Sequence, residues 1–214
     1  MDGLDLQHYD LALVRRAISV IFQDLVRYDL RFDENIGVGD IKQVRSYLDR
    51  EEQKPRKLKA DSLYPAASGN GHVPSSIIAA AEKSLAASLL PRFREGYQQM
   101  LGRRFETGVN LSGGEWQKVA LGRAYMREAQ VLILDEPTAA LDARAEYEVF
   151  LRFSELVAGR MAVIISHRFS TVRMADRIIV LQHGKVIEDG SHAELLARCG
   201  LYAELFSLQA EGYR

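Results

Sequence analysis

Cysteine is nearly absent from this sequence of 214 residues, since Cys199 is the only one. A single cysteine cannot form a disulfide within the chain, which favours a reducing compartment. The sequence also lacks an excess of charge, because 28 Lys and Arg side chains stand against 29 Asp and Glu for a formal net charge of −1. Such a balance provides no general attraction to nucleic acid or to anionic lipid.

Long apolar runs are missing as well. No run approaches the roughly 20 residues that a transmembrane helix needs. The sequence starts with MDGLDLQHYD, which is acidic and polar and unlike a signal peptide. We therefore expect any work at a membrane to go through a partner. With 47% hydrophobic and 27% charged residues, the composition is that of a globular protein with a substantial core.

Four apolar runs have the length of β-strands. They are Ile18–Phe22, Val131–Leu134, Ala162–Ile165 and Ile178–Leu181. The middle two carry Val and Ile without polar alternation, which is typical of parallel strands covered on both faces. Residues 143–158 between them predict a helix that begins after Asp142 and ends at Gly159. Strand, helix and strand make the βαβ unit of an α/β domain.

The last part of the sequence predicts a hairpin followed by a capped helix. Ile178–Leu181, the dipeptide His183-Gly184 and a second short run from Lys185 have the order strand, turn, strand. Ser191 with Glu194 three places later fits a capping box at the start of a helix.

The composition also suggests three regions along the chain. Residues 1–39 and 128–214 read as parts of an α/β core, and residues 40–127 read as a helical subdomain inserted between them. Within the insertion, residues 53–74 are rich in charge and turn-forming residues, so we expect a mobile loop there. Helical structure is expected to resume over Ser75–Leu90.

The segment Val131–Pro137, VLILDEP, ends a predicted buried strand on two adjacent carboxylates, Asp135 and Glu136. Ligands in open α/β sheets bind beyond the carboxyl ends of strands, and buried carboxylates are costly unless paired or bound to metal. We interpret Asp135 as a Mg²⁺ ligand, commonly through water, and Glu136 as the group that orients or deprotonates an attacking water. The alternative is a strand end that meets solvent in a polar turn.

The pentapeptide LSGGE at Leu111–Glu115 predicts the start of a helix. Ser112 and Glu115 fit a capping box, which explains both residues without a ligand. It does not explain Gly113 and Gly114, because each glycine costs on the order of 1 kcal/mol relative to alanine in a helix. Two glycines at a helix start let an anion approach the backbone N–H groups, so we favour a phosphate-binding turn over a bare cap.

Two further polar residues follow predicted strands. Gln23 comes directly after the first strand, and His167 closely follows Ala162–Ile165. Each residue alone is usual for a structural side chain at a strand end. Together with LSGGE and the Asp-Glu pair they form an ordered set, in which each strand end brings a polar group to the same edge of a sheet. Chance explains this order poorly.

The ordered set resembles the motifs of ABC ATPases. Gln23 is similar to their Q-loop, LSGGE to their LSGGQ signature with Glu in place of the last Gln, and VLILDEP to their Walker B strand. Ala140–Asp142 resembles the D-loop and His167 the H-loop. The phrases ETGV before the signature, and ADRI and EDGSHAEL after the H-loop, are similar to the exporter subfamily.

The resemblance implies ATP sandwiched between two such domains, each site combining the Walker motifs of one with the signature of the other. Glu136 and His167 would be the catalytic residues, the latter at the γ-phosphate. Asp135 would bind Mg²⁺, and Gln23 would couple metal and nucleotide to the transport subunits. The residues expected at the cofactor are Gln23, Leu111, Ser112, Gly113, Gly114, Glu115 and Asp142, of which the serine and both glycines would hold ATP bound to the partner.

The resemblance also sets expectations for the fold, the cofactors and the partners. It implies an α/β fold with a P-loop NTPase-like parallel sheet and an inserted helical subdomain that carries the signature. The cofactors would be ATP and Mg²⁺. The partners would be a second ABC ATPase domain, in a homo- or heterodimer, and a transmembrane transport subunit that holds the chain at the cytoplasmic face. No nucleic acid is expected.

One family motif is absent from the sequence. ABC ATPases need G-x-x-x-x-G-K-[ST], whose backbone N–H groups and Lys grip the phosphates. The only Gly-Lys pair is Gly184-Lys185, with Ile179 in place of the first Gly and Val186 in place of Ser or Thr. In the family this loop precedes the segment that resembles Asp2–Arg16. We therefore expect that the fold lacks the early strands and the P-loop helix. We also expect that the chain alone is inactive as an ATPase.

Three alternatives remain open. The SMC type of ABC ATPase also places the signature and Walker B in a lobe without the phosphate loop, but a long coiled coil divides its ATPase head between the Q-loop and the signature. Here Gln23 and Leu111 lie in one chain, and the sequence between them has no sustained heptad repeat of a coiled coil. The chain could also be a non-catalytic module that supplies only its signature to a complete partner, or a gene fragment without function.

Overall fold

The computed structural model describes residues 5–52, 73–105, 107–137 and 151–211. The chain divides into two compact units, Met1–Ala162 and Val163–Arg214. The predicted D-loop with Asp142, and most of the predicted loop 53–74, lie outside the described residues.

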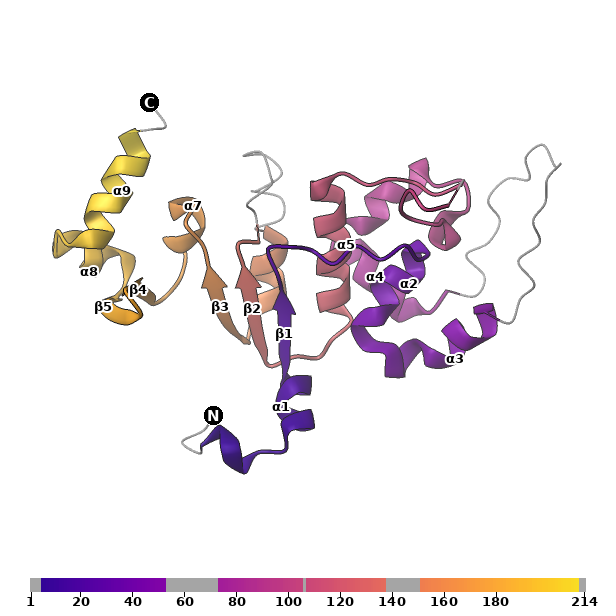
Figure 1. The fold of residues 1–214 in the computed structure, drawn as a ribbon, viewed down its shortest axis with the longest axis horizontal. Helices are drawn as coiled ribbons and strands as arrows, with labels where there is room; N and C mark the ends of the chain where they lie inside the picture. The colour runs from indigo at the N-terminus through magenta and orange to yellow at the C-terminus, as the bar shows by residue number, and fades with distance from the viewer. Residues whose placement is uncertain (1–4, 53–72, 106, 138–150, 212–214) are drawn as a thin grey trace. The chain divides into compact units, whose positions relative to one another are not determined.

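A three-stranded parallel sheet begins in the first unit and confirms the predicted α/β class (Figure 1). Its order is β1 (Ile18–Ile21), β2 (Val131–Asp135) and β3 (Met161–Ile165), and β3 crosses the boundary between the units. The first two strands pair in parallel from Ile18 opposite Val131 to Ile21 opposite Leu134. Because their carboxyl ends are level, the residues that follow each strand emerge at one edge of the sheet.

The strands of the sheet differ in how far their side chains are covered. Ser19 and Ile21 of β1 share one face with Leu132 and Leu134 of β2, and all four are buried. Helix α5 (Gly113–Tyr125) packs near β1. On β3, by contrast, the alternate residues are exposed: Met161 is 67%, Val163 47% and Ile165 51% accessible to solvent. These three point to one side of their strand, since side chains alternate along it.

Around α5 lies a helical layer with its own apolar core (Figure 1). Its elements are α2 (Phe32–Gly37), η2 (Val38–Asp40), α3 (Ile41–Glu52), α4 (Ser75–Lys83), η3 (Ala86–Arg92) and η4 (Gly96–Gln98). Phe32, Ile36, Ile77 and Val119 are completely buried in this core, and the ring of Phe93 meets that of Phe32 edge to face at 5.2 Å. The apolar residues of α4 and α5 therefore pack against the other helices of this layer.

The helix predicted from Ser75 ends earlier than expected. α4 stops at Lys83, because Leu85 has a left-handed backbone with φ of 62° and breaks the α-helical path. The chain continues as the 3₁₀ helix η3, which contains Pro91. Leucine rarely takes this conformation, so no local sequence signal predicts the end of the helix there.

Before β1 lie a short 3₁₀ helix, η1 (Leu6–His8), and α1 (Leu11–Ala17). The carboxylate of Asp10 caps α1, accepting hydrogen bonds from the backbone N–H groups of Ala12 and Leu13. After β2, residues 151–157 are helical, and Gly159 with φ of 72° follows them, as expected for the predicted end of that helix.

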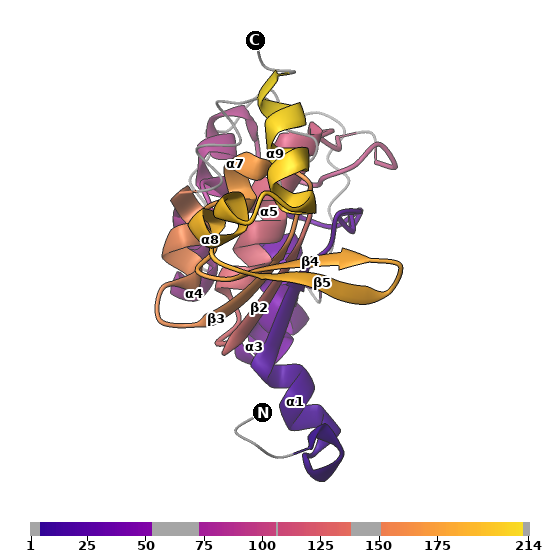
Figure 2. The ribbon, with the colours of Figure 1, turned by 90° about the vertical axis from the view of Figure 1, so that its left-hand side faces the viewer.

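The second unit contains the predicted hairpin and the predicted capped helix. β4 (Ile178–Gln182) pairs antiparallel with β5 (Lys185–Gly190), and the turn residues His183 and Gly184 both have positive φ. α7 (Phe169–Val172), α8 (His192–Ala197) and α9 (Leu201–Glu211) complete the unit, and Figure 2 shows the β-ribbon with α8 and α9. Ser191 and Glu194 form the expected capping box at the start of α8.

Among the described residues, no helix is both long enough and apolar enough to cross a bilayer.

The exposed side of β3 predicts how the chain behaves when expressed alone. Apolar strand surfaces that are open to water favour association and the binding of apolar dyes. We expect poor solubility and ANS fluorescence above that of an ordinary folded domain. The double substitution Val163→Thr, Ile165→Thr should lower the ANS signal, because threonine keeps a high preference for strands while removing apolar surface. A monomeric chain with a cooperative melt and no ANS binding would contradict this expectation.

Candidate functional site

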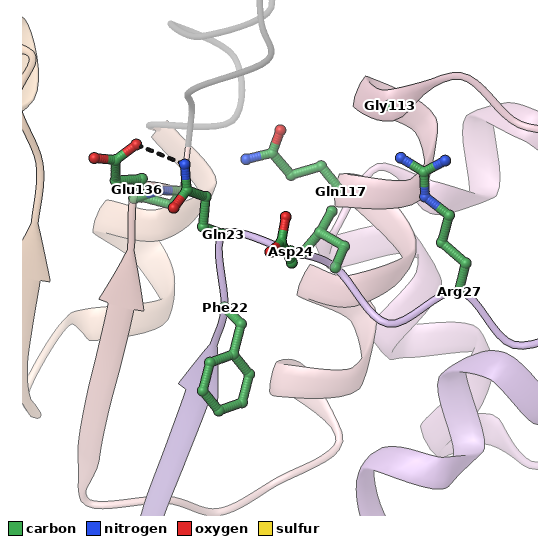
Figure 3. A pocket seen from close by; sticks show the side chains of 9 residues that line it. Phe22, Gln23, Asp24, Arg27, Gly113, Gln117 and Glu136 are labelled. Atoms are coloured by element: carbon green, nitrogen blue, oxygen red, sulfur yellow. Dashed lines mark hydrogen bonds between the residues drawn. The ribbon is translucent and has the colours of Figure 1, made fainter.

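A cavity of about 460 Å³ lies where β1 and β2 end beside the start of α5 (Figure 3). Its lining residues are Phe22, Gln23, Asp24, Leu25, Arg27, Gly113, Gln117, Glu136 and Pro137. Three of the residues singled out from the sequence, Gln23, Gly113 and Glu136, thus line one space although they belong to separate motifs. The sheet supplies two of them and the helix start supplies the third.

Gln23 and Glu136 are joined directly at one side of this cavity (Figure 3). The amide Nε2 of Gln23 donates a hydrogen bond to Oε2 of Glu136 at 3.1 Å, although the residues are 113 positions apart in the sequence. The parallel register of β1 and β2 brings them together, because each residue follows its strand closely at the same sheet edge. Glu136 also has a left-handed backbone, with φ of 44°. Such strain in a residue other than glycine is frequent at functional sites.

The signature-like turn has the predicted capping box. Ser112 precedes α5, and its Oγ accepts a hydrogen bond from the backbone N–H of Glu115 at 3.4 Å. In return, Oε2 of Glu115 accepts one from the backbone N–H of Ser112 at 2.7 Å. Leu111 is buried, whereas Ser112 is exposed. The turn is therefore anchored on the core side and presents Ser112 and the start of α5 outward.

Comparison with known proteins decides the family. A family model described as ABC transporter matches residues 1–139. The ATP-dependent lipid A-core flippase of Alcanivorax borkumensis is 35% identical over 208 residues, which are 97% of this chain and 30% of that protein. The chain belongs to the ABC transporter family. It resembles the ATP-binding domain of exporter-like members, and the sequence resemblance is confirmed.

Other relatives agree with this assignment. The subtilin transport ATP-binding protein SpaT of Bacillus subtilis is 34% identical over 96% of this chain and 29% of its own length. The solved structure of a bacterial Atm1-family ABC exporter with ATP bound has a TM-score of 0.74 at 31% identity, covering 98% of this chain and 31% of that one. The chain thus spans about three-tenths of the length of these ABC proteins.

Asp135 is the last residue of β2 and directly precedes Glu136, but it does not line the cavity. It shares a face of the strand with Val131 and Ile133, opposite the face that carries Leu132 and Leu134. Carboxylate and amide oxygens are the ligands that Mg²⁺ prefers, and Mg²⁺ commonly takes only one or two carboxylates and completes its shell with phosphate and water. Asp135 and Gln23 fit this pattern. Within the described residues, no group of three acidic, His or Cys side chains forms a closed metal cage.

One contact of the signature helix was not predicted from the sequence. Arg123 of α5 donates hydrogen bonds to the backbone O of Val26 at 2.6 Å and to Asn35, at its backbone O and at Oδ1, at 2.8 and 2.7 Å. Its guanidinium also lies 4.8 Å from the centre of the Tyr28 ring. Burial lowers the pKa of Arg123 to about 10. The segment that follows the Q-loop residue is thereby fixed to the helix that follows the signature.

His167 lies in the second unit, two residues after the end of β3. A residue of α9, Gln209, binds the backbone on both sides of Arg168. Its Nε2 donates to the backbone O of His167 at 3.3 Å, and its Oε1 accepts from the backbone N–H of Phe169 at 2.9 Å. The rings of Tyr202 and Phe206 pack against Phe169 at 5.3 Å each. The last described helix thus supports the turn that carries His167, the residue predicted for the H-loop.

The Arg123 contacts predict a large and specific loss of stability on substitution. Arg123→Met should lower the free energy of unfolding by about 3 kcal/mol, because three oxygen acceptors lose a charged donor and part of the site is buried. Arg127→Met is the matched control, since Arg127 lies one turn further and donates to the backbone O of Arg15 near the surface. We expect that change to cost less than about 1 kcal/mol. Chemical denaturation of both variants checks the difference, and equal losses would contradict it.

Proposed function

We propose that this chain is part of the ATP-binding and ATP-hydrolysing domain of an ABC exporter, which couples ATP hydrolysis to transport across a membrane. The observation that carries the proposal is that Gln23, Gly113 and Glu136 line one cavity at the carboxyl edge of the sheet. That edge is where ligands of open α/β sheets bind. The alternative SMC-like assignment has no such support, because the relatives named above are a flippase, a transport protein and an exporter.

In the proposed reaction, catalysis consists mainly of positioning and of charge stabilisation, as in phosphoryl transfer generally. Glu136 would orient or deprotonate the attacking water, and the amide of Gln23 would hold that carboxylate in place. Asp135 and Gln23 would hold Mg²⁺, which when bound would neutralise charge on the phosphates. His167 would contact the γ-phosphate, supported by the backbone contacts of Gln209.

The signature turn would act on the nucleotide of a second domain. Ser112, Gly113 and Gly114 would meet the γ-phosphate of that ATP through the amino end of α5, with Leu111 and Glu115 holding the turn in shape. Asp142 would approach the nucleotide from the D-loop. The proposed partners are therefore a second ABC ATPase domain, identical or different, and a transmembrane transport subunit or domain at the cytoplasmic face of the membrane. The relatives named above carry different cargoes, so we propose no particular one.

We further propose that these 214 residues do not hydrolyse ATP by themselves. The sequence contains no G-x-x-x-x-G-K-[ST] motif. In its one Gly-Lys pair, Gly184 has φ of 74° in the hairpin turn and Lys185 begins β5, so the pair does not lie in a loop before a helix. A phosphate grip would have to come from residues outside this sequence. This supports a second candidate function, in which the chain supplies only its signature turn to a complete partner.

The first test of this proposal concerns nucleotide binding by the isolated chain. We expect neither micromolar binding of Mg-ATP nor turnover, because the loop that grips the phosphates is absent from the sequence. Calorimetry with Mg-ATP and a phosphate-release assay measure the two properties. Micromolar binding together with turnover that Glu136→Gln abolishes would contradict the predicted inactivity.

The second test concerns the signature turn. The chain should associate with an intact homologous ABC ATPase domain, whose catalytic Glu has been disabled, more strongly with ATP than with ADP. The glycine N–H groups are expected to meet the γ-phosphate, which ADP lacks. Ser112→Arg should abolish the ATP-dependent part by filling the phosphate approach. Sedimentation or light scattering measures the association. Equal association with ATP, ADP and no nucleotide would argue against the proposal and leave the gene-fragment alternative ahead.

A further inference from the structure

The signature turn of this chain has a carboxylate, Glu115, where ABC ATPases have an amide. Glu115 is the third residue of α5, and there a carboxylate suits the helix, because it caps the backbone N–H of Ser112 and interacts favourably with the helix dipole. The same negative charge lies within one turn of Gly113 and Gly114. A phosphate that approaches those glycines would be repelled by an uncompensated Glu115.

A cation from another element pairs with this carboxylate. Arg92, the last residue of η3, donates from Nη1 to Oε1 of Glu115, while Oε2 of Glu115 accepts from Ser112. The side chain of Glu115 is 19% exposed and that of Arg92 is 52% exposed. One turn further along α5, Nζ of Lys118 donates to Oγ of Ser88 in η3 at 3.4 Å. Two polar contacts therefore hold η3 beside the first turns of α5 and keep Arg92 at the carboxylate.

Stability alone gives little reason for this pair. Exposed ion pairs typically contribute little to folding, since solvent screens them and ordering the side chains costs entropy. Their stronger effect is on which charges can approach a surface. With Arg92 in place, the acidic residue of the turn belongs to a pair of zero net charge. Without it, the turn would present a negative charge to an anion.

We propose that Arg92 neutralises Glu115 and thereby keeps the acidic signature turn able to accept the γ-phosphate of ATP held by a second ATPase domain. Arg92 is then a positioning residue, which acts through Glu115 rather than on the nucleotide. The proposal rests on the function proposed above, because it needs the turn to meet ATP in trans. It assigns a role to a residue outside every motif recognised in the sequence.

The test is a double-substitution cycle in the association assay with the intact homologous domain and Mg-ATP. Arg92→Ala should weaken the ATP-dependent association roughly tenfold, which is the order expected for one uncompensated charge near a phosphate. Glu115→Gln provides the reference background, because it removes the carboxylate that Arg92 would neutralise. In that background, adding Arg92→Ala should change the association by less than about twofold, because the charge that needed neutralising is gone. Arg94→Ala is the matched control, since it removes an exposed positive charge two residues away and should have little effect.

The possible outcomes separate the two proposals. Unchanged association of Arg92→Ala, or a double variant as weak as that single variant, would overturn the role of Arg92 in neutralising Glu115. An equal loss in Arg94→Ala would also overturn it, because a general effect of positive charge would then explain the result. Association by Glu115→Gln but not by the wild type would mean that Arg92 does not compensate the carboxylate. Association by none of the proteins would contradict the function proposed above, and the role of Arg92 with it.

Discussion

The contacts of Arg123 are the constraint on which the candidate site depends most. A guanidinium that is partly removed from water needs acceptors, and burial lowers the pKa of this one to about 10. The acceptors come from Val26 and Asn35, on the segment that follows Gln23. Asn35 in turn donates from Nδ2 to the backbone O of Tyr28, Leu30 and Arg31. These hydrogen bonds thus hold the segment that follows Gln23 against α5. The cavity that both of them line takes its shape from this arrangement.

The sequence predicted those features whose causes are local. Strands, capping boxes and the hairpin turn depend on residues within a few positions, so Ser112 with Glu115 and His183 with Gly184 were recognisable before the fold was known. The early end of α4 was missed because a leucine, not a glycine, takes the left-handed backbone there. The roles of Arg123 and Gln209 were missed for another reason. Their partners lie 88 and 42 residues away, and no spacing pattern points across such distances.

The placement of Asp135 and Glu136 shows how far a motif alone predicts geometry. The sequence indicated two adjacent carboxylates at a strand end, and the structure places them there. It could not indicate that only Glu136 faces the cavity, since this follows from strand alternation and from the left-handed backbone that turns the chain after β2. That conformation costs on the order of 1–2 kcal/mol for a residue with a side chain. The hydrogen bond from Gln23 is one of the contacts that can offset this cost.

Each part of the candidate site also has its own support within one unit. The signature turn is held by its capping box and by Arg92, the Gln23–Glu136 contact by the register of two paired strands, and the H-loop turn by Gln209 of α9. None of these supports includes the loop that grips phosphate. A signature turn that is shaped by its own neighbours can keep its geometry whether or not nucleotide is bound in the same chain. The signature turn is therefore the part of the proposed site that depends least on the loop that grips phosphate.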